Sequence, residues 1–278
     1  KRFGFARGFE SFQGFWPDLS EDHRVPAGQV RRLRETLRAA ADDSRGFFGY
    51  WHFLPPHAPY DPPSADRLDS DHLMGTALEQ AGGLDNLLPL SHGARQPEPA
   101  ERQAIEDLYD DSLRHVDRIL SEIHQELEDT GMLQDTLWIL VSDHGEAFGQ
   151  HGLWQHARTV HEEMVRVPLV VVVPEDQRQR FPSGRRSTPV GLADLVPTLI
   201  ELFDLPGAEP WSSASLVDLL EGEDIPGEGR PPIVTRTAGP AEHVAIRSGD
   251  LKLIHRLTGF GDDGKRKGPG TWELYDLS

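Results

Sequence analysis

A short motif of acidic and histidine residues offers the best candidate for chemistry in this chain. The motif is S-D-H-G-E at residues 142–146, and it directly follows the apolar run 136–142. A carboxylate oxygen from Asp143 beside an imidazole nitrogen from His144 is a usual ligand pair for a divalent metal ion. Both side chains face one ion only if the chain turns at once, which Gly145 allows. The alternative is that Asp143 caps the next segment beside a hydrogen-bonded histidine, and spacing alone leaves both interpretations open.

Further histidines are weaker candidates when each is taken alone. Prolines on both sides of His57 fix the backbone there and aim the side chain, although prolines also occur in ordinary rigid loops. His151, His156 and His161 follow the acidic motif. A zinc-protease helix of the H-E-x-x-H type would need a histidine at 165, where Val165 stands, so that interpretation fails. A lone histidine is more often packed or at the surface than catalytic.

Two other patterns are interpreted as structural. Asp111 and His115 stand four residues apart on a predicted helix, where a solvated pair is a commoner arrangement than half a metal site. Residues 259–265 match the start of a phosphate-binding loop, but Arg266 replaces the required Ser or Thr and two aspartates would repel phosphate. We predict a hairpin loop there.

Composition excludes several classes of function. The 28 Lys+Arg and 46 Asp+Glu residues give 28 − 46 = −18, a charge that repels nucleic acid and anionic membranes. The chain has no cysteine, which excludes thiolate zinc sites, disulfides and a cysteine nucleophile within these residues. No apolar run approaches the roughly 20 residues that span a bilayer, and no signal peptide is evident. We therefore expect a soluble protein without membrane insertion, in a compartment that the sequence leaves open.

The apolar pattern predicts the elements that position the candidate residues. Helical spacing indicates helices over residues 27–41, 101–130 and 191–203, with Gly131 capping the second. Continuous apolar runs predict buried strands. The run 136–142 is typical of a central parallel strand covered on both faces, and the other two runs are 46–54 and 167–173.

The predicted fold class is α/β, a mostly parallel sheet flanked by helices, with a small antiparallel C-terminal subdomain. Four alternating segments after residue 232 form that subdomain, so we place the domains at residues 1–230 and 231–278. Because parallel strands bring their carboxyl ends to one edge, we expect His57, Asp143, His144 and His156 to converge on one cleft.

Taken together, these segments resemble the sulfatase family of the alkaline phosphatase superfamily. The resemblance rests on their order and spacing, because no single motif is decisive. The matching segments are F-A-R-G-F-E-S-F at 5–12, P-H-A-P-Y at 56–60, the helix at 109–117, the strand and motif at 136–146, R-V-P-L at 166–169, D-L-V-P-T-L at 194–199, and the tail at 251–254 and 273–277.

The resemblance implies an alkaline-phosphatase-like fold and a role for each candidate residue. Asp143 and His144 would be ligands of one divalent metal ion, Ca²⁺ first, with Mg²⁺, Mn²⁺ or Zn²⁺ as alternatives. His57 and His156 would contact the sulfate group and take part in catalysis. The implied substrate is a small-molecule or glycan sulfate ester.

One departure from the family is large. Its nucleophile is a formylglycine made from Cys or Ser in C/S-x-P-x-R, and the chain contains no such motif. We expect a fragment whose nucleophile lies in a missing upstream segment, whose C-terminal subdomain is truncated, and which alone is inactive. The alternatives are a phosphodiesterase, phosphonate monoester hydrolase or phosphoethanolamine-type transferase of the same superfamily, or a catalytically dead relative.

Overall fold

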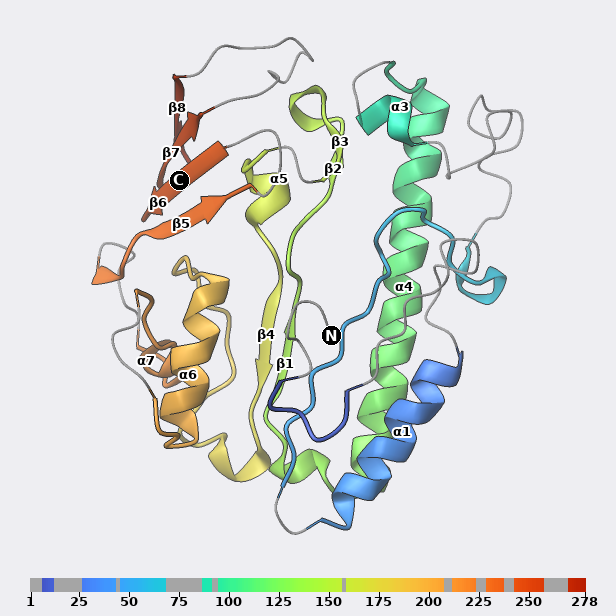
Figure 1. Ribbon diagram of the computed structural model, residues 1–278, viewed down its shortest axis with the longest axis vertical. Coiled ribbons are helices and arrows are strands. Elements are labelled where there is room, and N and C mark those ends of the chain that lie inside the picture. Colours follow the sequence, from blue (N-terminus) through green and yellow to red (C-terminus); the bar gives the residue numbers. More distant parts are fainter. Residues whose placement is uncertain are drawn as a thin grey trace. The chain divides into compact units, whose positions relative to one another are not determined.

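The computed structural model describes residues 7–12, 27–43, 46–68, 87–91, 95–156, 159–207, 212–223, 229–237, 243–257 and 270–278. The chain divides into two compact units, whose elements are labelled in Figure 1. The first unit joins Lys1–Leu87 to Glu98–Leu133, and the second joins Leu88–Pro97 to Gln134–Ser278. The hairpin loop predicted at residues 259–265 lies outside the described residues.

The first unit contains two long helices at the predicted places. Helix α1 spans Ala27–Ala41 and α4 spans Pro99–Asp129. Helix α4 begins at a capping box in which the Glu98 main-chain N–H donates to the Glu101 carboxylate (2.9 Å). Gly131 follows the C-cap residue Thr130, and its φ of 73° suits the position after a helix end. The predicted glycine cap is thereby confirmed.

Helix α1 packs on α4 through leucines and one buried carboxylate. Leu33 and Leu37 are buried. The side chain of Glu126 on α4 is 1% exposed and accepts hydrogen bonds from Arg34 Nε (2.7 Å) and Arg38 Nε (2.5 Å) on α1. These arginines, Arg38 foremost, hold the pKa of Glu126 below its ordinary value. The carboxylate therefore stays ionised inside the helix pair.

The strand predicted over residues 46–54 is wrong. This segment is irregular, and it leaves Phe48 and Tyr50 well exposed. A run of aromatic residues shows only that apolar area is present. It forms a buried strand only where neighbouring strands cover it, and no described strand pairs with this segment.

The second unit is built on antiparallel strand pairs. Strand β1 (Trp138–Val141) pairs antiparallel with β4 (Leu169–Val172), and β2 (Ala147–Phe148) with β3 (Trp154–Gln155). The further α-helices of this unit are α3 (Leu88–Ser91), α5 (Glu162–Val165), α6 (Leu195–Leu202) and α7 (Val217–Leu220). Short 3₁₀ helices lie at Ser64–Asp66 in the first unit and at Leu133–Asp135, Gln150–Gly152, Glu175–Gln177 and Leu192–Asp194.

A parallel sheet is not found among the described strands, each of which pairs antiparallel. The run 136–142 does form a strand, but its partner runs the other way and Leu140 and Val141 are partly exposed. The physical reason is that an apolar run indicates only that both faces of a strand can be buried. It does not indicate whether the neighbouring strand runs parallel or antiparallel.

The small C-terminal sheet is confirmed. Its strands lie in the order β5 (Ile233–Arg236), β6 (His243–Ser248), β7 (Leu251–Arg256) and β8 (Thr271–Asp276), all antiparallel. Buried Ala245 and Ile254 from this sheet pack with Val160. Across the residues that the structure describes, no helix has both the length and the apolar character needed to cross a membrane.

Candidate active site

The loop after β1 holds the acidic motif in a defined conformation. The Ser142 hydroxyl donates to the His144 carbonyl (2.7 Å), and the His144 main-chain N–H donates to Asp143 Oδ1 (3.0 Å). These local hydrogen bonds turn the chain at the strand end. Asp143 and His144 therefore lie side by side at the end of β1.

Gly145 is required for packing rather than for its backbone freedom. Its N–H donates to the Met164 carbonyl of α5 (2.8 Å). A Cβ atom at this position would lie 2.1 Å from the Glu163 carbonyl oxygen, closer than any real contact. The expected turn exists, but the glycine is there because the loop lies directly against α5.

Asp143 and His144 present one oxygen and one nitrogen to the same point. His144 Nδ1 donates to the Gly145 carbonyl (2.8 Å), so the lone pair of the neutral ring is on Nε2. That Nε2 lies 3.8 Å from Asp143 Oδ1, and both side chains are exposed enough to reach an ion. Since metal–ligand bonds are about 2.0–2.6 Å, one divalent ion can contact both atoms. The described ranges contain no group of three or more His, Cys, Asp or Glu side chains that could hold a metal ion. Asp143 and His144 could therefore supply only part of the ligands of such an ion.

His156 lies against this pair and is held by a carboxylate. Its ring stacks on that of His144 with centroids 4.3 Å apart. Its Nδ1 lies 3.1 Å from Oε1 of Glu146, whose side chain is 4% exposed. The hydrogen bond with Glu146, and the nearby charges of Glu146 and Asp143, raise the pKa of His156, although its burial acts in the opposite sense. Sequence reasoning quoted Glu146 in the motif but missed this role.

The structure thus brings together three of the four predicted site residues. Asp143, His144 and His156 lie in the second unit and in mutual reach. His57 belongs to the first unit, where its Nδ1 donates to the Ala58 carbonyl (2.5 Å). Its convergence with the other three stays a prediction.

His151 and His161 serve the packing of α5. Their rings stack at 3.9 Å, and His151 Nδ1 lies 2.8 Å from Glu163 Oε1. Buried His161 also meets the Tyr275 ring edge-on at 5.5 Å. The zinc-protease interpretation, already excluded by Val165, has no counterpart in this arrangement.

The interpretation of Asp111 and His115 as a solvated pair is wrong. Both residues are 3% exposed. Asp111 Oδ1 accepts from Arg114 (2.5 Å) and from the Leu68 main chain (3.4 Å), and His115 pairs with Asp66. The segment around the Ser64–Asp66 helix packs on this face of α4. The helical periodicity of the sequence could not show that this segment buries Asp111 and His115.

Comparison with known proteins now decides the family. The sequence model described as Sulfatase matches residues 5–205. This chain belongs to the sulfatase family. It is 32% identical over 150 residues to choline-sulfatase of Rhizobium meliloti (strain 1021), a match that covers 52% of this chain and 27% of that protein.

Two solved structures illustrate the fold that this chain shares with known proteins. The structure of BT4656 in complex with D-glucosamine-2-N,6-O-disulfate aligns with a TM-score of 0.60 at 20% identity, over 89% of this chain and 63% of that one. The phosphonate monoester hydrolase SpPMH from Silicibacter pomeroyi aligns with a TM-score of 0.64 at 19% identity, over 92% and 54%. The sulfatase chain described here therefore spans only part of the length of its relatives, with the alkaline-phosphatase-like fold of these neighbours.

Proposed function

We propose that the full-length protein is a metal-dependent sulfuric ester hydrolase. The observation that supports this most is the adjacency of Asp143 and His144 to His156, which Glu146 holds in place. This arrangement joins two metal-ligand atoms to an imidazole that can carry a proton. Family membership supplies the reaction class.

In this proposal Asp143 Oδ1 and His144 Nε2 would hold one divalent ion, with Ca²⁺ as the first candidate and Mg²⁺, Mn²⁺ or Zn²⁺ as alternatives. Such an ion would supply polarisation of the sulfate oxygens. Glu146 keeps the His156 ring in one orientation, and its charge favours the protonated imidazole. His156 then donates a hydrogen bond or a proton to the ester oxygen as the bond breaks. His57 contacts the sulfate group as well in this proposal.

The nucleophile of the proposed reaction is a formylglycine. The 278 residues contain no cysteine and no S-x-P-x-R motif from which one could be made. In this proposal the nucleophile therefore comes from polypeptide outside these residues, and they supply the metal pair and the histidines. By themselves they form no covalent sulfate intermediate, because no positioned nucleophile attacks the ester.

The substrate class follows from chemistry and from the relatives. A metal pair and two imidazoles recognise the sulfate group, so the proposed substrate is a sulfate ester of a small molecule or a glycan. Choline-sulfatase and the complex with glucosamine disulfate represent both kinds among the related proteins. Phosphonate monoester hydrolysis is the second candidate, favoured by the likeness to SpPMH.

The deciding experiment compares the full-length protein with the 278-residue chain. Each is assayed with an aryl sulfate, an aryl phosphate diester and an aryl phosphonate monoester, with Ca²⁺, Mg²⁺, Mn²⁺ or Zn²⁺ added. We expect metal-dependent sulfate release by the full-length protein alone. If the full-length protein hydrolyses the phosphonate monoester or the phosphate diester faster than the sulfate ester, phosphonate monoester or phosphodiester hydrolysis would replace sulfate ester hydrolysis as the proposed function.

A variant pair separates the proposed roles in the full-length protein. Asp143→Ala should abolish activity through loss of the metal, measured by calorimetric titration. His156→Ala should keep the metal and slow turnover by about 10²–10⁴-fold, as for loss of a general acid. Full activity of Asp143→Ala would show that the metal site is assigned to the wrong residues.

A further inference from the structure

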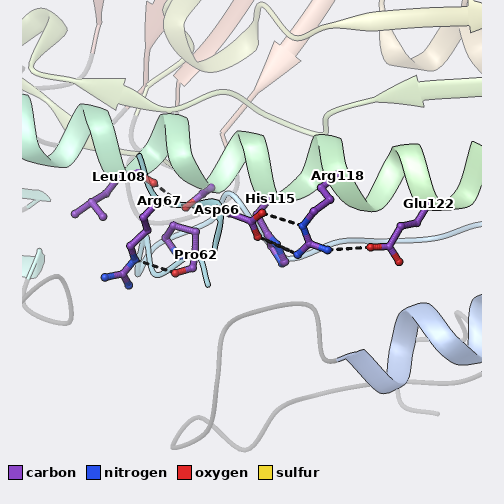
Figure 2. Close-up of polar contacts among 8 residues, drawn as sticks. Pro62, Asp66, Arg67, Leu108, His115, Arg118 and Glu122 are labelled. Atoms are coloured by element: carbon purple, nitrogen blue, oxygen red, sulfur yellow. Dashed lines mark hydrogen bonds and ion pairs between the residues drawn. The ribbon is translucent and has the colours of Figure 1, made fainter. Parts of the chain in front are cut away.

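Asp66 and His115 form a buried pair in the first unit that the proposed site does not use. His115 Nδ1 lies 2.8 Å from Asp66 Oδ2, and the two side chains are 4% and 5% exposed. Figure 2 shows His115 projecting from α4 towards Asp66, which follows the proline-rich segment around Pro62. The pair thus joins α4 to the segment that also carries His57.

Arg118 fixes the charge of this pair. Its guanidinium donates to both oxygens of Asp66, at 2.8 and 2.9 Å, and to Glu122 at 2.9 Å, as Figure 2 shows. Arg118 is the main cause that lowers the pKa of Asp66. Asp66 is therefore ionised and acts only as an acceptor.

The hydrogen between Asp66 and His115 must then belong to the imidazole. An unprotonated Nδ1 at 2.8 Å from a carboxylate oxygen would place two lone pairs face to face, so Nδ1 carries the hydrogen. Arg118 Nη2 also lies 3.1 Å from Nδ1, but it is already aligned on the carboxylate. The neutral ring consequently has its lone pair on Nε2.

That Nε2 atom is buried and makes no hydrogen bond to any described residue. His115 lines a small, partly open pocket together with His57, Asp61, Ser112 and three prolines. The polar side chains of the wall have partners of their own. Ser112 donates its hydroxyl hydrogen to the Leu108 carbonyl (2.8 Å), Asp61 is a carboxylate paired with Arg67, and the His57 Nδ1–H donates to the Ala58 carbonyl.

A buried acceptor without a partner destabilises a fold, and a pocket with room for one water-sized group removes that cost. We propose that this pocket binds one water molecule that donates a hydrogen bond to His115 Nε2, and that His115 is through it a positioning residue for His57. The water-binding site stands on the geometry alone. The consequence for catalysis rests on the proposed function, in which His57 contacts the sulfate.

The first test is nuclear magnetic resonance of the 278-residue chain with ¹⁵N-labelled histidine. Ring nitrogen shifts should assign the Nδ1–H tautomer to His115, and its ring protons should show cross-relaxation with one long-lived water. An Nε2–H tautomer in the unmodified chain, or a ring without bound water, would overturn the proposal without any variant having to fold.

Two substitutions then test the link to His57. Asp66→Asn places an amide donor opposite Nδ1, which should move the ring hydrogen of His115 to Nε2. His115→Asn keeps an N–H donor for Asp66 and removes the Nε2 acceptor from the pocket. Both should shift the ring signals of His57, whereas His124→Asn, at an exposed position on the same helix, should not. An unmoved His57 in both variants would refute the positioning role.

The last arm uses the full-length protein. Both substitutions should lower kcat by about 10–100-fold with little change in KM, as expected for a group that orients another. Unchanged kcat in both variants would refute the role of His115 in catalysis. A full-length protein that hydrolyses no sulfate ester would instead refute the proposed function, and the resonance experiments would still decide whether the water site exists.

Discussion

His156 and Glu146 form the residue contact on which the proposed chemistry depends most. A buried carboxylate beside Nδ1 selects which ring nitrogen carries the permanent hydrogen, and it restrains rotation of the imidazole. The same logic orients the histidine of a catalytic triad, where the acidic residue acts through the ring and not on the substrate. Glu146 is therefore a positioning residue in this proposal.

Replacing Glu146 by Gln should slow sulfate ester hydrolysis by the full-length protein about 10–100-fold, because the ring loses its fixed orientation while the metal ligands remain. The measurement is kcat together with metal affinity. Glu163→Gln is the matched control, since Glu163 makes a similar contact with His151 outside the proposed site. An equal loss of activity in both variants would show that these contacts only support folding.

At the scale of elements, α5 acts as the backing of the motif loop. Gly145 donates to Met164 and has no space for a side chain in front of the Glu163 carbonyl. Asp143 and His144 are thereby fixed to the helical turn Glu162–Val165, which follows them in the sequence. A shift of α5 would move Asp143 and His144 with it.

We expect Gly145→Ala to lower the free energy of unfolding by about 1–3 kcal/mol, the usual cost of overpacking. The measurement is the urea midpoint of the 278-residue chain. Gly184→Ala is the control, because a Cβ there meets only the end of the flexible Arg186 side chain. A stable Gly145→Ala chain with unchanged loop signals would disprove the packing requirement.

The α1–α4 contact should make the first unit sensitive to acid. Because the folded-state pKa of Glu126 is lowered, its stabilising effect is complete above the unfolded value of about 4.3 and is lost as the pH falls through the folded value. Glu126→Gln should weaken hydrogen-exchange protection of α4 at neutral pH and match the unmodified chain in strong acid.

The exposed ion pair of Glu35 with Arg31 provides a control for this prediction. Glu35→Gln should change protection by little at any pH, since exposed pairs contribute at most about 1 kcal/mol. A Glu126→Gln chain that is as stable as the unmodified one at pH 7 would contradict the role given to the buried carboxylate.

These elements also show what the sequence could foretell. Local signals sufficed for α1, for α4 with its glycine cap, and for the C-terminal strands, because capping and alternation are properties of neighbouring residues. They failed at residues 46–54 and for the direction of the partner of β1, which depend on distant strands. In the candidate site, Asp143 and His144 were found from their adjacency in the sequence, whereas the role of Glu146 needed the tertiary contacts. The same holds for the Asp66–His115 pair outside that site.

For the whole molecule, charge and exposed apolar area act in opposite directions. A net charge of −18 keeps copies of the chain apart. Val170 and Val172 on one face of β4 are 48% and 44% exposed, beside the partly exposed Leu140 of β1. Exposed apolar patches of this kind promote association once repulsion is screened.

Raising the salt concentration from about 0.01 to about 1 M, which shortens the Debye length from about 30 to 3 Å, should therefore increase self-association of the 278-residue chain. The measurement is the weight-average mass from sedimentation velocity. The double variant Val170→Thr and Val172→Thr should associate less. A mass independent of salt in the unmodified chain would contradict this expectation.

The interleaving of the two units has a consequence for the order of folding during synthesis. Leu88–Pro97 belongs to the second unit although the chain on both sides of it belongs to the first. Gln96 accepts a hydrogen bond from Trp154 Nε1, 58 residues further on (3.2 Å). During synthesis on the ribosome, Leu88–Pro97 emerges before α4 and cannot contact its later partners, such as Trp154, until α4 has been made. The first unit can close once residue 133 has emerged, so its completion precedes that of the second, which needs residues as far as Ser278.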